Sequence, residues 1–193
     1  MLDQLSQTSL PAPCILPNFL PVETCQKIST WAAESNRWED ALPPWNQRSI
    51  NLESMDGHIR SCLLDIFTDV KAKLRDYWHT TNPLYGDIFQ IVRWQPGDKL
   101  EPPHADAEHL NGDPHPFAYR EFAAIIYLNQ EYTGGQIYFP GFRMIPEIST
   151  GTLAIFPGTL DYLHGVTPVQ SGTRYTIAGF LTSQKKYGNQ YLI

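Results

Sequence analysis

The 193-residue chain has little of what stabilises small secreted proteins or anchors membrane proteins. Its three cysteines, Cys14, Cys25 and Cys62, are an odd and widely spaced set. They fit neither a disulfide framework nor a zinc knuckle, so a reducing compartment is expected. The N-terminal residues lack the basic and apolar stretches of a signal peptide. No apolar run approaches the roughly 20 residues that a membrane-spanning helix needs. These absences predict a soluble, cytoplasmic protein with no membrane partner.

Positive charge is also scarce. The 14 Lys and Arg residues are outnumbered by 20 Asp and Glu residues, which gives a formal net charge of −6. A nucleic-acid-binding protein should show a basic stripe, whereas the small clusters here, 71–75 and 185–186, are interpreted as solvated faces. We therefore expect no nucleic-acid partner. Nothing in the pattern indicates an oligomeric state.

With 42% apolar residues and no internal repeat, the chain is expected to be one globular domain over residues 1–193. Helical support is predicted at about 20–80 and a β core at about 86–182. The first helix should run from Val22 to Glu34, and the second from about Met55 to Trp78. The second helix carries an apolar stripe at spacings of three or four residues, formed by Ile59, Leu63, Ile66, Val70 and Leu74.

From Asp87 onward, short β runs alternate with Gly and Pro. Closely spaced short strands favour a sandwich or barrel over a parallel sheet. We therefore predict an α+β fold in which the N-terminal helices pack on one face of a jelly roll. The predicted strands are Ile88–Arg93, Leu100–Ala105, Glu121–Leu128, Gln136–Phe139, Leu153–Phe156, Tyr162–Val166 and Arg174–Leu181.

A possible metal site begins at His104-Ala105-Asp106. Residues i and i+2 of an extended strand point to the same face, so His104 and Asp106 can bind one ion from one side. His164, in a later apolar β run, would complete two imidazoles and a carboxylate. This ligand set leaves positions open on non-haem Fe(II) for oxygen and a cosubstrate. The alternatives are a surface His and Asp at a loop edge and a hydrogen-bonded core histidine.

Arg174, ten residues after His164, supplies a cationic group that matches a carboxylate. Strand alternation places Arg174, Thr176, Ala178 and Phe180 on one face, as expected for a narrow pocket with a charged floor. The alternative is an exposed arginine at a strand end. Tyr127 is predicted to donate a phenolic hydrogen bond to the same anion, or else to be a half-buried strand residue. An open iron site beside an anion site indicates an oxygenase.

His109 and His115 are rival second histidines. Both lie in a polar stretch with Asn-Gly and two prolines, which predicts a loop. A ligand on a loop would be poorly positioned, so neither is included in the metal site.

The chain resembles the 2-oxoglutarate- and Fe(II)-dependent dioxygenases, specifically their prolyl 4-hydroxylase-like branch. The resemblance covers most of the chain and rests on the lead-in Leu16-Pro17-Asn18-Phe19-Leu20, on Gln90-Ile91-Val92-Arg93-Trp94 and on Pro103-His104-Ala105-Asp106. It continues in Ile126-Tyr127-Leu128-Asn129, in Gly134-Gly135-Gln136-Ile137-Tyr138-Phe139-Pro140, in 151–158, and in His164 followed by Arg174.

The resemblance implies a distorted double-stranded β-helix with His104, Asp106 and His164 as iron ligands. It implies that Arg174 binds the distal carboxylate of 2-oxoglutarate and that Tyr127 donates a hydrogen bond to it. Trp94 stands where many relatives have a tyrosine, and is assigned a contact with the cosubstrate. Fe(II), 2-oxoglutarate and O2 are the expected cofactors, with ascorbate as a reductant.

The expected reaction is hydroxylation of an unactivated C–H bond in a peptidyl proline, releasing succinate and CO2. Asp106 argues against the halogenases of this superfamily, which have a small residue in place of the carboxylate. Phe180 stands where the nucleic-acid demethylases typically carry a second arginine. Two alternatives stay open: hydroxylation of a small molecule such as a free amino acid, and a non-catalytic, cupin-like protein that binds metal.

Two loops are predicted to frame a substrate groove. Asn36–Asn51 carries Trp38 and Trp45, whose rings are either partners for a peptide or simply buried. Ala107–Tyr119 is expected to act as a lid.

Overall fold

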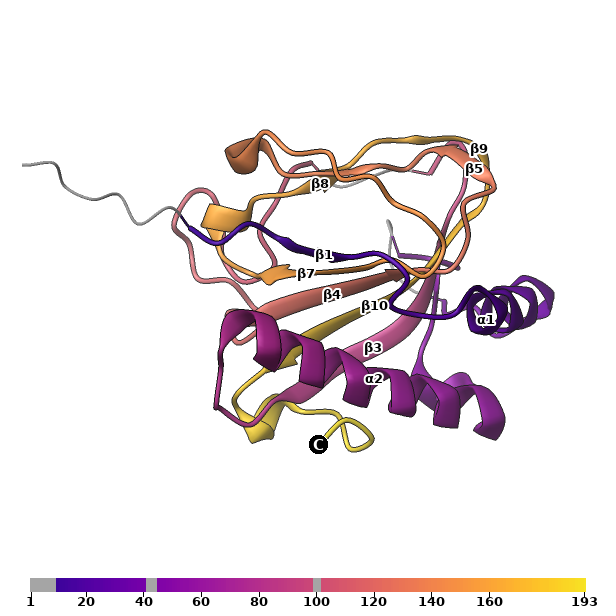
Figure 1. The fold of residues 1–193 in the computed structure, drawn as a ribbon, viewed down its shortest axis with the longest axis horizontal. Coiled ribbons are helices and arrows are strands. Elements are labelled where there is room, and N and C mark those ends of the chain that lie inside the picture. The colour runs from indigo at the N-terminus through magenta and orange to yellow at the C-terminus, as the bar shows by residue number, and fades with distance from the viewer. Residues whose placement is uncertain (1–9, 41–44, 99–101) are drawn as a thin grey trace, which may run out of the picture.

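The computed structural model describes residues 10–40, 45–98 and 102–193. Its core is a six-stranded antiparallel sheet with the strand order β1-β7-β4-β10-β3-β2. Two short ribbons, β5–β9 and β6–β8, form a second β layer on one side of this sheet, and α2 lies along the other side (Figure 1). The strands are β1 Cys14–Leu16, β2 Ser49–Ile50, β3 Tyr85–Trp94, β4 Phe122–Tyr127, β5 Tyr132–Gly134, β6 Ile137–Tyr138, β7 Leu153–Pro157, β8 Gly165–Val166, β9 Val169–Gly172 and β10 Arg174–Thr182.

The two helices follow the predicted apolar periodicity. α1 spans Val22–Glu34, as predicted, and α2 spans Gly57–Trp78, two residues later at its start than expected. The α2 stripe from Ile59 to Leu74 is buried. It belongs to the same apolar cluster as Ile177 and Leu181 of β10, so the helix packs on the outward face of the large sheet. None of the helices in the described residues is long and apolar enough to cross a membrane.

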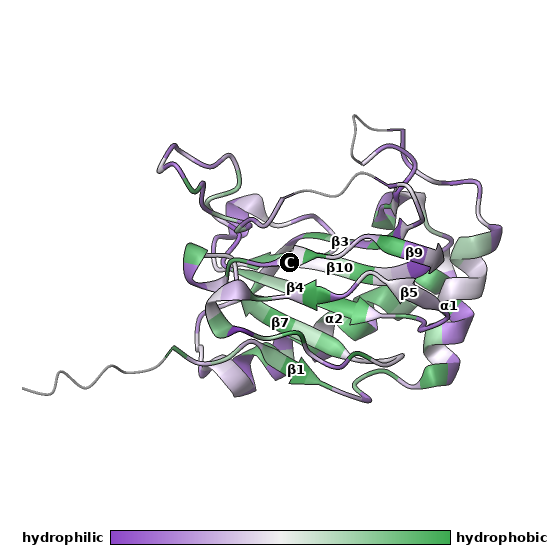
Figure 2. Ribbon diagram, turned by 90° about the horizontal axis from the view of Figure 1, so that it is seen from above, coloured by the Kyte–Doolittle hydropathy of each residue, from purple (hydrophilic) through white to green (hydrophobic). Residues whose placement is uncertain are grey.

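The inward face of the large sheet packs against the second β layer in one part and lines a cavity in the other. Part of it packs against the second β layer in a smaller apolar cluster that includes Ala154 and Phe156 of β7 and Phe139 just after β6. The rest lines a cavity, to which β10 contributes Arg174, Thr176, Ala178 and Phe180. The predicted alternation of β10 is therefore confirmed. Figure 2 shows apolar residues concentrated along the central strands and polar residues in the surrounding loops.

Two predicted strands need correction. Within Leu100–Ala105, residues 100 and 101 lie outside the described residues, and the remainder forms only one isolated bridge, between His104 and His164. Pro102 and Pro103 explain this, because proline has no N–H to donate to a ladder. Within Tyr162–Val166, the first residue closes a 3-10 turn over Leu160–Tyr162, and only Gly165–Val166 is a strand.

The two tryptophans of the long loop ending at Asn51 lie in different environments. Trp38 is buried, with the guanidinium of Arg93 3.9 Å from its ring centre. Trp45 is 37% exposed and lines the cavity. Of the two alternatives for these rings, burial holds for Trp38, whereas Trp45 is available to a ligand.

The C-terminal segment packs on the core. Leu192 is buried, and its carbonyl accepts a hydrogen bond from the Gly86 N–H (3.0 Å). The ring of Tyr187 stacks on Tyr119 at the end of the predicted lid, with ring centroids 3.9 Å apart. The tail thus contacts both the first residues of β3 and the loop beside the cavity.

Candidate active site

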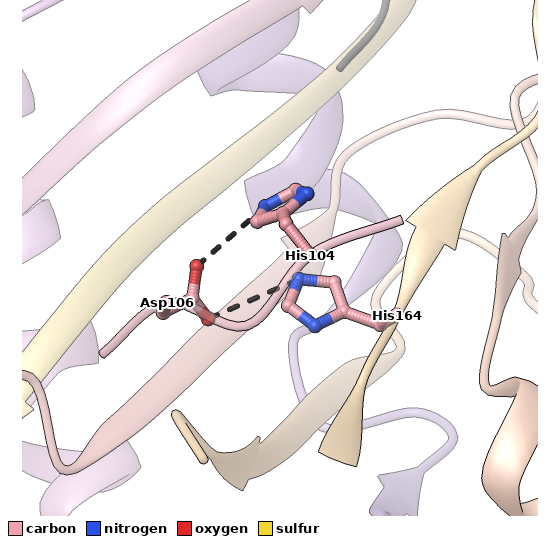
Figure 3. A group of neighbouring side chains, drawn as sticks. All are labelled: His104, Asp106 and His164. Atoms are coloured by element: carbon pink, nitrogen blue, oxygen red, sulfur yellow. Dashed lines mark ion pairs between the residues drawn. The ribbon is translucent and has the colours of Figure 1, made fainter. Parts of the chain in front are cut away.

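The three predicted metal ligands converge. One ligand atom from each of His104, Asp106 and His164 lies within 4.8 Å of the others (Figure 3). Nε2 of His104 is 3.8 Å from Oδ1 of Asp106, and Nε2 of His164 is 3.8 Å from Oδ2. These distances are too long for hydrogen bonds. They suit ligand atoms arranged around one ion, because each would lie roughly 2 Å from it.

The other ring nitrogens explain how the histidines are held. Nδ1 of His104 lies 3.0 Å from the Pro102 carbonyl oxygen, and Nδ1 of His164 lies 3.1 Å from that of Tyr162. A carbonyl oxygen only accepts hydrogen bonds, so each Nδ1 carries the proton and donates it. Each Nε2 then presents its lone pair toward Asp106, which is the tautomer that a metal ligand requires.

Asp106 supplies the test of whether a cation fits. Its residue is 8% exposed, and among the described residues Oδ2 has no hydrogen-bond partner. Burial raises the pKa of this carboxyl to about 6. A buried carboxylate without donors is costly unless a cation compensates for it. The donor set of two imidazoles and one carboxylate therefore fits an open Fe(II) site.

Arg174 and Tyr127 form a second buried site. Arg174 is 2% exposed, which excludes the alternative of an exposed strand-end arginine, and Tyr127 is fully buried. The Arg174 guanidinium carbon lies 4.9 Å from the Tyr127 ring centre. Burial raises the pKa of the Tyr127 hydroxyl, while the charge of Arg174 acts in the opposite direction.

Two donors at this second site are left without a partner. Among the described residues, neither Arg174 Nε nor the Tyr127 hydroxyl makes a hydrogen bond, although both atoms are buried. Buried donors are normally paired, and these two meet the requirement of a carboxylate. The residues present therefore fit the distal carboxylate of 2-oxoglutarate.

Trp94 lies directly across the strand pair from Arg174. Its indole is 9% exposed, lines the cavity and meets the edge of Trp45 at a centroid distance of 5.6 Å. Arg48, paired with Asp98 at 3.0 Å, lies over the same ring. The structure thus places Trp94 in the cavity wall, and its contact with a cosubstrate stays a prediction.

The cavity has a volume of about 1010 Å³, and the triad and Arg174 both line it. His109 and His115 also line it, with ring centroids 4.4 Å apart. Among the described residues, the group of three or more residues able to hold a metal is the triad alone. His109 and His115 do not belong to that group.

Gln90 and Arg120 are among the polar cavity residues that were not predicted. Gln90 of β3 is 7% exposed and faces the cavity. Its alternation with Val92 and Trp94 could have revealed it. Arg120 was harder to find, because it stands outside any strand. Its guanidinium lies between the rings of Phe117 and Phe180, 3.9 and 4.0 Å from their centres.

Comparisons with known proteins agree with this geometry. Residues 89–182 match the 2OG-Fe(II) oxygenase superfamily. Prolyl 3-hydroxylase 1 of Rattus norvegicus is 25% identical over 141 residues, which is 63% of this chain and 19% of that protein. The chain thus spans about a fifth of the length of this curated relative.

Solved structures share the fold. The viral collagen prolyl hydroxylase of Paramecium Bursaria Chlorella virus-1, in its 2OG complex, has a TM-score of 0.67 at 18% identity, covering 90% of this chain and 96% of that one. A prolyl hydroxylase of Trichoplax adhaerens, in complex with a hypoxia inducible factor oxygen degradation domain peptide, has a TM-score of 0.64 at 14% identity, covering 91% and 85%.

The jelly-roll core, the triad and the match over 89–182 lead to one conclusion. Residues 89–182 form a domain of the 2OG-Fe(II) oxygenase superfamily, whose members are oxidoreductases that use Fe(II), 2-oxoglutarate and O2.

Proposed function

We propose that the chain is a 2-oxoglutarate- and Fe(II)-dependent dioxygenase that hydroxylates an unactivated C–H bond and releases succinate and CO2. The observation that carries the proposal is the position of the triad and Arg174 in the walls of one cavity. The unpaired buried donors of Arg174 and Tyr127 support it, because they match an anion.

In this proposal, His104, Asp106 and His164 hold Fe(II), Arg174 binds the distal carboxylate of 2-oxoglutarate, and Tyr127 donates its O–H to the same group. The metal supplies, with 2-oxoglutarate and O2, the oxidising chemistry of the reaction. The protein orients both carbon substrates, and the low exposure of Asp106 and Arg174 keeps these two charged groups away from bulk water. Because Asp106 fills the carboxylate position, hydroxylation is expected rather than halogenation.

For the second substrate we propose a prolyl residue within a peptide. The cavity of about 1010 Å³ lies at the top of the range found for drug-sized ligands, so it has room beside 2-oxoglutarate. Trp45 and Phe117, 37% and 40% exposed, supply aromatic rings of the kind that bind proline in extended peptides. The peptide complex of the Trichoplax enzyme is a further support.

The hydroxylated carbon is proposed to be C4, in keeping with the prolyl 4-hydroxylase-like motifs of the chain. The rat relative carries the name of a prolyl 3-hydroxylase, so the two positions must be separated by experiment. Analysis of the hydroxyproline isomer formed in a peptide product decides between them. A product with hydroxyl only at C3 would overturn the C4 assignment and leave the reaction class intact.

The first test is O2-dependent conversion of 2-oxoglutarate to succinate with added Fe(II). Wild type should turn over, while His164→Ala and Arg174→Ala should each lose most of the activity. A screen with proline-containing peptides and free amino acids then identifies the second substrate. Faster turnover with a free amino acid than with any peptide would overturn the peptide proposal. Failure to bind both metal and 2-oxoglutarate would overturn the reaction itself.

A further inference from the structure

The double glycine Gly134-Gly135 has no part in the chemistry above, although it belongs to the motif by which the chain resembles its family. The pair follows the start of β5 and precedes β6, in the second β layer that lies over the large sheet (Figure 2). Both residues have positive φ values, +73° and +63°. Residues other than glycine rarely adopt positive φ values. The surroundings of the two glycines, however, differ.

Gly134 must be glycine because of a close backbone contact. A Cβ atom at this position would lie 2.0 Å from the Pro168 carbonyl oxygen, where β5 and β9 pair with a shift in register. Backbone atoms on both sides make this approach rigid. Gly134 is therefore needed for the ribbon itself.

Gly135 has a different neighbour. A Cβ atom here would lie 2.9 Å from Cδ of Arg174, and 3.2 Å from both Cε2 of Tyr132 and Cγ2 of Val169. The first distance is shorter than real Cβ contacts allow. Its N–H is already shared between the carbonyls of Thr167 (3.1 Å) and Pro168 (3.2 Å), so the backbone cannot easily retreat.

Arg174 cannot easily move away either. Its residue is 2% exposed, and Tyr127 lies against the guanidinium at 4.9 Å from ring centre to Cζ. Val169, itself 5% exposed, fills the space beside Gly135. Arg174 therefore lies in a slot between the two β layers, and the missing side chain at Gly135 leaves room for its Cδ.

We propose that Gly135 is a positioning residue for Arg174: a hydrogen at this position lets the guanidinium reach the place where it binds the second carboxylate of 2-oxoglutarate. The inference rests on the proposed function of Arg174. It adds that any side chain at Gly135 displaces the arginine and selectively weakens the binding of a dicarboxylate.

The test compares Gly135→Ala with Gly97→Ala. Gly97 has φ +86° and nothing within 4 Å of its would-be Cβ, so its alanine variant also places a side chain on a positive-φ backbone but makes no such contact. Binding of 2-oxoglutarate and of 2-oxobutanoate, a 2-oxo acid without the second carboxylate, is measured by calorimetry on Mn(II)-loaded protein without oxygen. Gly135→Ala should weaken 2-oxoglutarate about tenfold or more. It should leave 2-oxobutanoate within about twofold of wild type, and Gly97→Ala should change neither ligand.

A double variant separates positioning from general damage. Arg174→Ala removes the nearest atom that the new Cβ would meet, so in that background Gly135→Ala should lower the melting temperature less than it does in wild type. The loss that remains reflects the backbone conformation and the 3.2 Å contacts with Tyr132 and Val169. In protein that retains Arg174, Gly135→Ala should lower the melting temperature more. Equal weakening of both ligands, or an undiminished melting loss in the double variant, would overturn the proposal.

Failure of the underlying function has its own signature. If wild type binds 2-oxoglutarate no better than 2-oxobutanoate, or if Arg174→Ala leaves that preference unchanged, then Arg174 does not hold the second carboxylate. The contact between Gly135 and Arg174 would in that case still appear in the melting temperatures.

Discussion

His104 and His164 are joined by two backbone hydrogen bonds, the N–H of each donating to the carbonyl of the other at 2.9 and 3.0 Å. This bridge brings two segments that are distant in sequence into direct contact. The centroids of the two imidazole rings lie 4.8 Å apart. Each ring donates a hydrogen bond from Nδ1 to a backbone carbonyl, that of Pro102 for His104 and that of Tyr162 for His164. The metal site is therefore organised by the backbone before any ion binds.

This arrangement predicts opposite effects of Asp106→Asn on the two forms of the protein. Without metal, the variant should be more stable than wild type, because it removes a buried carboxylate whose Oδ2 has no partner among the described residues. With metal at about a hundred times its Kd, wild type should gain about 2.7 kcal/mol and the variant little. Melting curves with Mn(II) and with chelator measure both effects.

Asp161→Asn is the matched control for that prediction, since Asp161 is exposed and lies near His164 in sequence. Asp161→Asn should leave the melting curves with Mn(II) and with chelator the same as those of wild type. A less stable metal-free Asp106→Asn variant that still binds Mn(II) would show that this carboxylate is structural and not a ligand.

Tyr127→Phe should weaken 2-oxoglutarate binding and leave the free protein intact. The hydroxyl is buried and makes no hydrogen bond of good geometry among the described residues, so its removal should cost the free protein little. A hydrogen bond to a charged group contributes about 1.5–3 kcal/mol, which corresponds to at least about tenfold in Kd. Calorimetry gives the affinity and a melting curve gives the stability. Unchanged affinity would mean that Arg174 binds the anion without help from Tyr127.

Local periodicity was sufficient to predict the helices and the face of the last strand that lines the cavity. α1 and the α2 stripe follow from spacings of three and four residues, and Arg174 and Thr176 follow from alternation. These features depend on neighbours within a few residues. The same reasoning applied to β3 would have identified Gln90, which alternates with Val92 and Trp94.

The remaining features depend on contacts distant in sequence. The bridge at His104 is a single residue pair after two prolines, so no strand pattern precedes it. β2, β5 and β9 are two to four residues long, and pairing with a distant partner defines them. The position of Arg120 between two aromatic rings likewise requires Phe180, which lies far along the chain on β10.

The cysteines predict how stability should change at high pH. Burial raises the pKa of both Cys14 and Cys25 to about 11 from an ordinary 9.0. Because the unfolded thiols lose their protons first, the native state should lose stability as pH rises from about 9 to about 11, and should be unaffected by these groups below 9. Urea unfolding at a series of pH values measures the slope. A variant with Cys14→Ala and Cys25→Ala should show a shallower decline, and an identical decline would exclude the two thiols as its source.

Arg120→Lys should separate peptide binding from the chemistry at iron. The guanidinium lies between the rings of Phe117 and Phe180, and its Nε donates to Asp87 at 2.7 Å, so the group is fixed in the cavity wall. Lysine keeps the charge but loses the planar group that stacks between two rings. We expect KM for a peptide to rise about tenfold, while 2-oxoglutarate decay without peptide stays unchanged. Arg75→Lys, at an exposed position on α2, is the control. Equal loss of both activities in Arg120→Lys would mean that Arg120 supports the whole site and does not bind peptide.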